Sequence, residues 1–292
     1  MDEALDAKKG YLAGLGAYFV WGLLPLYWKL IEAPAFQITI WRMVQAAVLM
    51  TALVWWRQHT SPRDLFADKR ASAIHFGTAL LLFVNWFVYV YAVNSDRVVE
   101  SSLGYFINPL VSVALGLVFL GERLRRAQQL AVAVALVGVA ILTIEAGSLP
   151  WISLALAFTF GLYGLIRKLS PRNSFEGLTQ EMLWMLPFSA GALLWLGRRG
   201  ELVGGDTAST VAMCFLGLLT ALPLVMFATA ARNLPLSVVG MMQYLAPTMQ
   251  FLLGVFVFGE IVSGGRWLGS AVIWVALAIL ASDSARSYSR QR

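Results

Sequence analysis

Ten long apolar runs follow one another along this chain of 292 residues, and short polar connections separate them. A helix needs about 20 largely apolar residues to cross the hydrocarbon core of a bilayer. Spanning β-strands are disfavoured because they are about ten residues of alternating polarity, whereas LAVAVALVGVAILTI (130–144) does not alternate. We therefore expect an all-α integral membrane protein. Its ten transmembrane helices are predicted near residues 11–31, 36–56, 73–94, 101–120, 127–145, 149–168, 177–197, 209–231, 237–258 and 266–283.

The composition excludes the main soluble classes. Only 13% of the residues are charged and 59% are hydrophobic, whereas a soluble chain carries about 25% charged residues. A single cysteine, Cys214, excludes a disulfide scaffold. The net charge of +6 does not indicate nucleic-acid binding, because the basic residues lie in the gaps between apolar runs. The first run (11–30) is too long for the core of a signal peptide, so we expect no cleavable leader.

The basic residues of the connections predict the orientation, because short cytoplasmic loops carry an excess of Lys and Arg. One side holds 16 of the 22 basic residues: Lys8, Lys9, Arg57, Arg63, Lys69, Arg70, Arg123, Arg125, Arg126, Arg167, Lys168, Arg172, Arg232, Arg286, Arg290 and Arg292. The other side holds five: Lys29, Arg97, Arg198, Arg199 and Arg266. Arg42 lies within a span. The bias predicts a multi-pass protein with both termini in the cytoplasm.

The sequence contains an internal repeat. Residues 104–122 align with 242–260 at an offset of 138, which pairs Phe106 with Tyr244, Pro109 with Pro247, Gly116 with Gly254, Gly121 with Gly259 and Glu122 with Glu260. Residues 21–30 align with 160–169 at an offset of 139, which pairs Trp21 with Phe160, Gly22 with Gly161 and Lys29 with Lys168. We expect two domains, 1–146 and 147–292, each with five spans.

An odd number of spans in each repeat forces the second copy to enter the membrane from the opposite face. Inverted repeats are typical of secondary transporters, whose substrate site lies near the membrane midplane where the halves meet. Two equivalent halves can exchange conformations, and that exchange would turn an outward-open cavity into an inward-open one.

At this point the sequence resembles a known family. SSLGYFINPLVSVALGLVFLGERLRR (101–126) resembles the end of an EamA repeat of the drug/metabolite transporter superfamily. NWFVYVYAVNSDRVVESSLGYFINPL (85–110), GSLPWISLALAFTFGLYGLIRK (147–168) and IWVALAI (273–279) are most similar to its RarD branch. The resemblance covers nearly the whole chain. It implies ten helices in two inverted repeats and export of small metabolites across the bacterial inner membrane. Related YddG-type exporters move amino acids, including aromatic ones.

Polar side chains within the apolar runs are candidates for substrate contacts, because they are costly in hydrocarbon and usually face a cavity or the bundle interior. They are Asn85, Asn108, Gln180, Gln243 and Gln250. Asn108 precedes Pro109, and Gln243 lies four residues before Pro247, so both stand where a proline removes a backbone hydrogen bond. A freed carbonyl beside an amide could hold a charged group of a zwitterion. In the alternative interpretation these amides bridge helices.

Aromatic side chains in the first, third, fourth, sixth and ninth spans would line a cavity suited to an amphiphilic organic solute. With the amides they give the predicted substrate site: Tyr18, Trp21, Asn85, Trp86, Tyr89, Phe106, Asn108, Phe160, Tyr163, Gln243 and Tyr244. By resemblance, these spans line the cavity in the family. The alternative is that the aromatics fill helix packing or the interfacial belt.

Glycine and proline residues in the spans are candidate hinges. They are Gly22, Pro25, Pro109, Gly161, Gly164 and Pro247. Close helix packing is the alternative use of membrane glycines. Small residues on the fifth and tenth spans (Ala131, Ala135, Gly138, Gly269) fit packing within a monomer or between monomers, so the sequence leaves the oligomeric state open.

Arg42 and Glu181 are repeat mates at an offset of 139, and inversion puts them near opposite membrane faces. We therefore expect no salt bridge between them; each could snorkel to the interface or pair locally. Glu181 is the best candidate for proton coupling. Because no carboxylate stands at the centre of a span, facilitated diffusion or exchange is favoured over a proton pump.

Enzyme chemistry has little support. The sequence has no HExxH and no GxxxxGK[ST], and His59 and His75 have no ligand set around them, so we expect neither metal nor cofactor. The leading hypothesis is a secondary transporter that exports small amphiphilic metabolites, with amino acids as the favoured class. The expected partners are this small-molecule substrate and the lipid bilayer. The alternatives are efflux of hydrophobic drugs by the same fold and an integral-membrane enzyme acting on lipids.

Overall fold

A computed structural model describes residues 2–95, 98–147, 151–202 and 206–289, and all regular structure in these ranges is helical. The predicted basic residues Arg97, Arg290 and Arg292, and the predicted start of the sixth span at 149–150, lie outside the described residues. The helices are α1 (Asp2–Trp28), α2 (Ala35–Gln58), α3 (Pro62–Ala67), α4 (Lys69–Asn94), α5 (Val98–Phe119), α6 (Arg126–Ala146), α7 (Trp151–Leu169), α8 (Ser174–Arg198), α9 (Thr207–Met213), α10 (Leu216–Asn233), α11 (Leu236–Met242), α12 (Leu245–Phe256) and α13 (Gly264–Ser289).

In the described part of the chain, nine helical segments are long and apolar enough to cross a membrane. Two of these segments are each broken into a pair of helices, α9 with α10 and α11 with α12. The seventh predicted span corresponds to α8, a helix of 25 residues that is not among the nine, because Gln180 and Glu181 lower its mean hydropathy. The protein is therefore a multi-pass helical membrane protein. The short helix α3 was not expected from the sequence.

The break between α11 and α12 falls at Gln243 and Tyr244, just before Pro247. Proline cannot donate a backbone hydrogen bond and crowds the preceding turn, and the chain here makes tighter contacts such as the Ala246 amide to the Gln243 carbonyl at 3.3 Å. Pro109, its repeat mate, lies inside the unbroken helix α5. The same sequence motif therefore gives a continuous helix in one half and a broken helix in the other.

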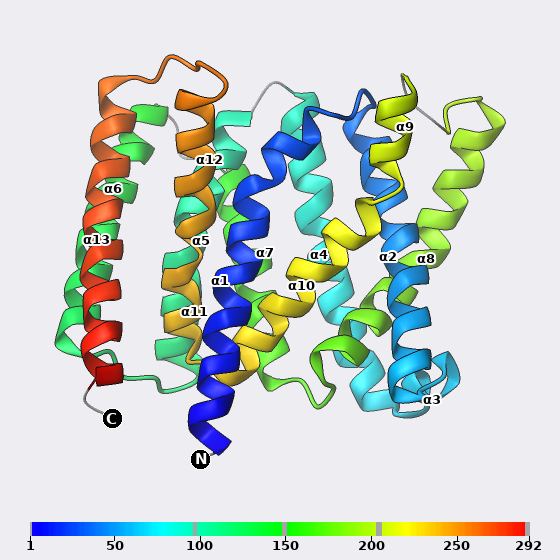
Figure 1. Ribbon diagram of the computed structural model, residues 1–292, viewed down its shortest axis with the longest axis horizontal. Helices are drawn as coiled ribbons and strands as arrows, with labels where there is room; N and C mark the ends of the chain where they lie inside the picture. The colour runs from blue at the N-terminus through cyan, green and yellow to red at the C-terminus, as the bar shows by residue number, and fades with distance from the viewer. Residues whose placement is uncertain (1, 96–97, 148–150, 203–205, 290–292) are drawn as a thin grey trace.

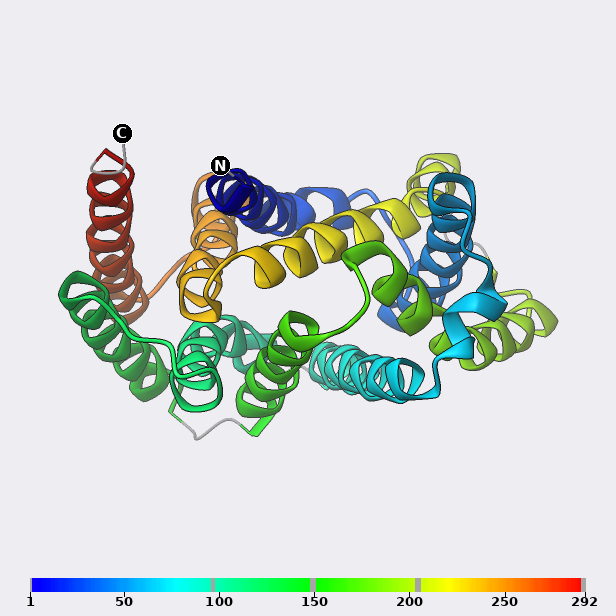
Figure 2. The ribbon, with the colours of Figure 1, turned by 90° about the horizontal axis from the view of Figure 1, so that it is seen from below.

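The helices form one bundle in which helices of the first half of the chain pack against helices of the second half (Figures 1 and 2). Helix α1 packs against α10 and α12, and α7 packs against α4 and α5. Helices α6 and α13 pair at one end of the bundle, and α2 and α8 pair at the other (Figure 2). Helix α5 also packs against α11, which brings together the two segments that carry the repeat mates Pro109 and Pro247.

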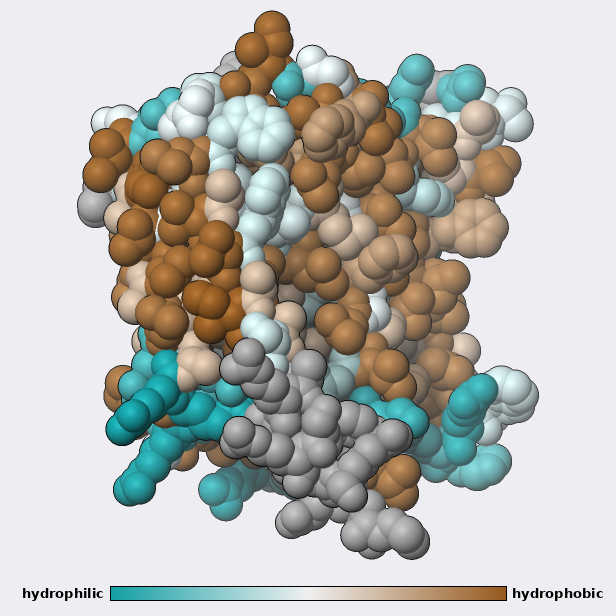
Figure 3. Space-filling model, turned by 60° about the vertical axis from the view of Figure 1, so that its left-hand side comes forward, coloured by the Kyte–Doolittle hydropathy of each residue, from teal (hydrophilic) through white to brown (hydrophobic). Residues whose placement is uncertain are grey.

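Helix α1 begins and α13 ends on the same side of the bundle, which we call the terminal face (Figure 1). Helices α4 and α8 also begin there, whereas α2 begins on the opposite face (Figure 1). The side of the molecule seen in Figure 3 carries a broad apolar band, with hydrophilic side chains gathered toward the terminal face. Exposed residues such as Ile144 and Val118, which are 80% and 74% exposed, suit a surface in contact with lipid.

Small residues let α6 and α13 approach closely. A side chain at Gly138 would lie 2.7 Å from Ile273 and 3.0 Å from the Gly269 carbonyl oxygen. Ala131 and Ala135 are fully buried in the same core. The small residues of the fifth and tenth predicted spans thus pack against each other within one chain.

Helices α5 and α12 end in matching corners. Gly121 and Gly259 adopt φ values of 63° and 68°, which are open to glycine at no steric cost. The amide of Glu122 donates to Gly116 at 3.1 Å, and the amide of Glu260 donates to the Gly254 carbonyl at 2.9 Å. This capping geometry confirms that the two Gly-Glu pairs terminate their helices.

Candidate functional site

Five aromatic side chains from three helices meet in the interior, and we call them the central aromatic cluster: Tyr18 and Trp21 of α1, Phe160 and Tyr163 of α7, and Phe227 of α10. The ring centroids of Trp21 and Phe160 are 5.7 Å apart, and those of Phe160 and Phe227 are 4.9 Å apart. The repeat mates Trp21 and Phe160, one from each half of the chain, therefore contact each other.

Phe227 was missed by sequence reasoning, although it contacts all four of the other rings. A signal was present, because Phe227 stands 138 residues after Tyr89, the offset that also relates Pro109 to Pro247. Tyr18 and Tyr163 are 2% and 0% exposed, so the cluster is closely packed in this conformation. The two pockets that we describe lie elsewhere: one of about 500 Å³ between α2 and α8, and one of about 200 Å³ among α5, α6, α12 and α13.

Trp86 and Tyr89 of α4 lie beside Arg42 of α2, a half-buried side chain whose Nε atom is itself buried. The Arg42 guanidinium carbon is 4.3 Å from the centroid of the Trp86 ring, and the rings of Tyr89 and Tyr105 are 6.4 Å apart. A cation–π contact contributes about 0.5–2 kcal/mol, whereas an arginine at the centre of a spanning helix costs about 2.5–3.5 kcal/mol or more. Arg42 is half-buried and stands off the centre of α2, as the eighth of its 24 residues, so the aromatic contact offsets part of the cost of placing this cation in the span.

Asn108 of α5 and Gln243 at the break after α11 lie on the packed faces of these helices, where a side chain at Gly240 would come within 2.9 Å of the Ser112 Cβ atom. The Gln243 amide donates to Ser112 Oγ at 3.2 Å. Asn108 Oδ1 and Gln243 Oε1 are buried and accept no hydrogen bond from the described residues. Two acceptor oxygens thus stand at the contact between α5 and the break of the α11–α12 segment.

Three other predicted site residues do not join the aromatic cluster. Asn85 donates to the Leu156 carbonyl at 3.0 Å and to Thr159 Oγ1 at 2.9 Å, so its amide bridges α4 and α7. Phe106 and Tyr244 pack into a separate core with α6 and α13. Phe106 also lines the 200 Å³ pocket of that region.

The two remaining span amides also make structural hydrogen bonds. Gln250 of α12 donates to the Trp21 carbonyl of α1 at 3.0 Å, and Gln180 of α8 donates to the Leu65 carbonyl of α3 at 2.8 Å. For these two amides and for Asn85, the structure agrees with the interpretation that they bridge helices.

The candidate hinge glycines are in close contact with neighbouring helices. A side chain at Gly22 would lie 2.8 Å from Met249 of α12, one at Gly161 would lie 2.8 Å from Val111 of α5, and one at Gly164 would lie 3.1 Å from Phe227. Close packing is therefore one use of these three positions. Whether they also act as hinges, with Pro25, Pro109 and Pro247, stays a prediction.

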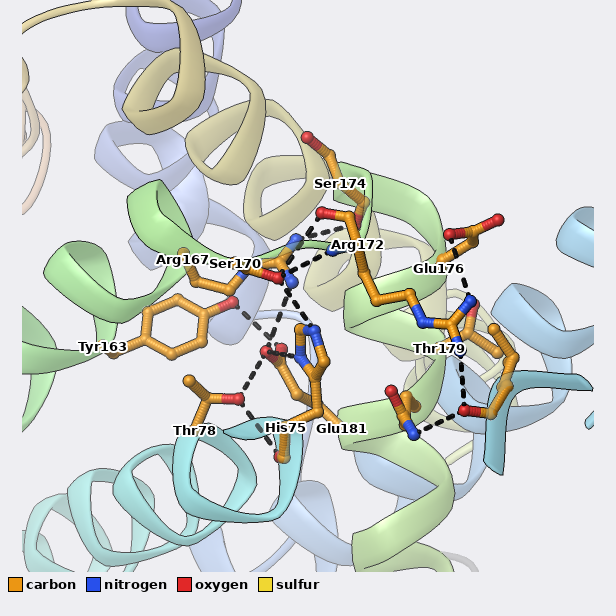
Figure 4. A network of polar contacts seen from close by, with 12 residues as sticks. His75, Thr78, Tyr163, Arg167, Ser170, Arg172, Ser174, Glu176, Thr179 and Glu181 are labelled. Atoms are coloured by element: carbon orange, nitrogen blue, oxygen red, sulfur yellow. Dashed lines mark hydrogen bonds and ion pairs between the residues drawn. The ribbon is translucent and has the colours of Figure 1, made fainter. Parts of the chain in front are cut away.

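A polar network surrounds Glu181 (Figure 4). It meets the aromatic cluster at Tyr163, and Glu181 lies in the first half of α8, which begins at the terminal face (Figure 1). Glu181 Oε1 accepts from Thr78 at 2.7 Å and lies 3.1 Å from His75 Nδ1 and 3.5 Å from Arg167 Nη1. Its second oxygen, Oε2, accepts from the Tyr163 hydroxyl at 3.2 Å. All five side chains are fully buried. The network ties α4, α7 and α8 together, and Tyr163 belongs to both the network and the aromatic cluster.

The network continues to the connection between α7 and α8. His75 Nε2 lies 2.9 Å from Ser170 Oγ, and the Arg167 guanidinium donates to the Ser174 carbonyl at 3.0 Å. Glu181 therefore pairs locally rather than snorkelling, because its carboxylate is fully buried. Arg42 does not take part. Sequence reasoning missed His75 and Arg167, since partners that come from different helices share no fixed spacing with Glu181.

Comparison with known proteins places these features in a family. The first half of the chain, residues 8–144, matches the EamA-like transporter family. The chain is 43% identical to "Protein RarD" of Streptomyces exfoliatus, with 98% of this chain and 92% of that protein covered. It is 41% identical to "Uncharacterized transporter YojE" of Bacillus subtilis, with 94% of each covered. It is 31% identical to "Chloramphenicol-sensitive protein RarD" of Pseudomonas aeruginosa, with 97% of each covered.

The fold is also found among solved structures. One crystal structure superimposes with a TM-score of 0.72 at 22% sequence identity, covering 93% of this chain and 96% of that chain. At this identity the similarity concerns the fold alone.

Proposed function

The chain belongs to the EamA-like transporters of the drug/metabolite transporter superfamily, as a RarD-like membrane transporter, and we propose that it exports small amphiphilic metabolites, amino acids above all, by alternating access. The observation that carries the substrate class is the contact between the central aromatic cluster and nearby polar groups in the bundle interior. Such a mixture suits a solute with an apolar side chain and a charged end.

Ten spanning helices in two inverted repeats, 1–146 and 147–292, are part of this proposal, with α8 as the tenth span. The helix contacts support it, because an exchange of the halves converts the following observed pairs into other observed pairs. The pair α4–α7 becomes α10–α1, and α5–α7 becomes α12–α1. The pairs α2–α8 and α6–α13 are their own counterparts. Two states related by this exchange would expose the substrate site to opposite faces in turn.

We assign the terminal face to the cytoplasm of a bacterial inner membrane, following the excess of Lys and Arg on that side. In this orientation the network around Glu181 closes the cytoplasmic side beneath the aromatic cluster. Opening that side would separate α4, α7 and α8, and would therefore break the contacts of Glu181 with Thr78, His75 and Tyr163.

The substrate's apolar side chain would lie against Trp21, Tyr89, Phe160 and Tyr163, and its polar end would lie near Asn108 and Gln243. The two unsatisfied acceptor oxygens of these amides support this arrangement. Of the other residues predicted from the sequence, Tyr18 belongs to the same cluster and Trp86 lies next to it, whereas Phe106 and Tyr244 face a different core.

Counterflow in proteoliposomes tests the proposal. Vesicles are loaded with unlabelled amino acids, and trace labelled amino acids are added one at a time without an ion gradient. Accumulation above that of protein-free vesicles is expected, and it is expected to be lost in the Asn108→Ala/Gln243→Ala double variant that is still extracted folded. Unchanged counterflow in the double variant would contradict the site, and no counterflow of any amino acid would contradict the substrate class.

Efflux of hydrophobic drugs is the second candidate. The name of the Pseudomonas aeruginosa relative, "Chloramphenicol-sensitive protein RarD", and the packed aromatic cluster favour it. The same vesicles decide between the two, because a drug exporter would exchange labelled chloramphenicol and no amino acid.

A further inference from the structure

Arg42 stands about a third of the way along α2, counted from the face opposite the termini, because it is the eighth of 24 residues. Its Nε atom is buried and has no hydrogen-bond partner. Throughout the described ranges, no carboxylate lies within ion-pair distance of Arg42, and its guanidinium makes no recorded hydrogen bond. A guanidinium has five donors in a planar fork that matches a carboxylate. Among the described residues, these donors are left unused.

The lack of a partner for the Arg42 guanidinium contrasts with the surroundings of Glu181. Glu181 holds the equivalent position in the other half, and its carboxylate is matched by donors from Thr78, His75 and Tyr163. The surroundings of Arg42 are aromatic and neutral instead: the Trp86 ring lies under the guanidinium, and the rings of Tyr89 and Tyr105 contact each other close by. A charged side chain inside a spanning helix normally pairs with another polar group, and here the described side chains supply no such group.

The face of α5 that begins at Tyr105 continues toward the terminal face through polar side chains. Tyr105, Asn108 and Ser112 are spaced three and four residues apart, so they lie on one side of the helix. Asn108 Oδ1 and, across the helix contact, Gln243 Oε1 are buried acceptors that receive no hydrogen bond from the described residues. Along α5, the acceptor of Asn108 therefore lies about one turn further toward the terminal face than Tyr105, whose ring contacts that of Tyr89 beside Arg42.

We propose that Arg42 binds the carboxylate of the transported solute, while the oxygens of Asn108 and Gln243 accept from its ammonium group. The inference rests on the proposed function and narrows it to α-amino acids with apolar or aromatic side chains. The donors of Arg42 and the acceptor oxygens of Asn108 and Gln243 match the two charged groups of a zwitterion. The ring of Trp86 lies against the guanidinium and stabilises its position. A solute without a carboxylate would lose its contact with Arg42.

The test compares L-phenylalanine with L-phenylalaninamide, which lacks the carboxylate. Counterflow of labelled phenylalanine gives its half-saturation concentration, and competition gives the inhibition constant of the amide. In the Arg42→Gln variant the half-saturation concentration should rise about tenfold or more, because a charge-assisted, bidentate contact is lost. The inhibition constant of the amide should change less than about threefold. The preference for the carboxylate, which is the ratio of the amide's inhibition constant to the half-saturation concentration of phenylalanine, should therefore fall.

Two further variants make the result decisive. Arg57→Gln is the matched control, since Arg57 also lies over a tryptophan ring, Trp56, but on the exposed end of α2; it should leave both constants unchanged. Arg42→Lys keeps the charge without the fork and should reduce the preference partially. If Arg42→Gln is not extracted as a folded protein, the Arg42→Lys ratio is the readout.

Each outcome has one meaning. A collapsed preference in the Arg42 variants supports the inference. Counterflow in which the variants keep the wild-type ratio overturns the role of Arg42 and leaves the proposed function standing. Wild-type vesicles without phenylalanine counterflow overturn the amino-acid proposal itself, and the inference falls with it.

Discussion

Glu122 and Glu260 end two helices with the same backbone corner, yet their carboxylates have different surroundings. Glu122 accepts hydrogen bonds from the amides of Leu236 and Ser237, at 2.6 and 2.8 Å, at the start of α11 in the other half. Glu260 is exposed, and no hydrogen bond to its carboxylate is recorded within the described ranges. Within the described ranges, the equivalent glutamates of the two halves therefore make unequal contacts.

This difference predicts unequal effects of substitution. Glu122→Ala removes the acceptor of two helix N-terminal amides, one of which belongs to the buried Leu236, and should lower the free energy of unfolding by about 1–3 kcal/mol. Glu260→Ala is the matched control and should change it by less than about 0.5 kcal/mol. Thermal unfolding of the detergent-solubilised variants measures both. If both variants lowered the free energy of unfolding equally, the different contacts of the two glutamates would not contribute to stability.

Removal of Glu181 should be among the most destabilising single substitutions. Glu181→Ala leaves the fully buried Arg167 without its carboxylate, and breaking a buried pair on one side costs about 3–5 kcal/mol. The double variant Glu181→Leu/Arg167→Met should recover a large part of the loss, because no charge is then left unpaired. Denaturant titration of the purified variants measures the unfolding free energies.

The ion pair between Arg172 and Glu176 is the control for the Glu181 variants. Its atoms are 3.8 Å apart and its side chains are 18% and 19% exposed, so solvent weakens the interaction. Glu176→Gln should cost less than about 1 kcal/mol. A Glu181→Ala variant as stable as Glu176→Gln would show that the network around Glu181 contributes little to the fold.

Trp21 is expected to contribute directly to substrate affinity. Its ring contacts Tyr18, Phe160 and Phe227, and aromatic pairs contribute about 0.5–1.5 kcal/mol beyond their buried area. Trp21→Leu should raise the half-saturation concentration for an aromatic amino acid about threefold to tenfold. Trp56→Leu is the control, since Trp56 is 71% exposed. Counterflow kinetics of the two variants would contradict the site if both changed equally.

The repeat offset predicted much of the interior from the sequence. The offset of 139 paired Trp21 with Phe160, which do contact, and the offset of 138 links Tyr89 to Phe227. The offset did not predict that Phe106 and Tyr244 would pack into a separate core with α6 and α13. Which side of a spanning helix meets which neighbour depends on the packing of all the helices, and an apolar run has too little periodicity to reveal it.

The partners of Glu181 were beyond sequence reasoning for a different reason. His75 and Thr78 are separated from Glu181 by 106 and 103 residues, and Arg167 was interpreted as a loop charge that sets the orientation. Their meeting depends on how the ends of α4, α7 and α8 converge. The break at Gln243 likewise depends on tertiary contacts, since the equivalent proline in α5 leaves its helix continuous.

The close approach of α6 and α13 gives the last prediction. Gly138→Ala would place a methyl group 2.7 Å from Ile273 and 3.0 Å from the Gly269 carbonyl, so the helices must separate, at a cost of about 1–3 kcal/mol. Gly191→Ala is the control, because nothing lies within 4 Å of that position, and a gain of about 0.5–1 kcal/mol is expected from the lower flexibility of the unfolded chain. Because the small residues already pack within one chain, Gly138→Ala should leave the mass of the detergent-solubilised particle unchanged. A change of mass by light scattering would instead assign this face to contacts between chains.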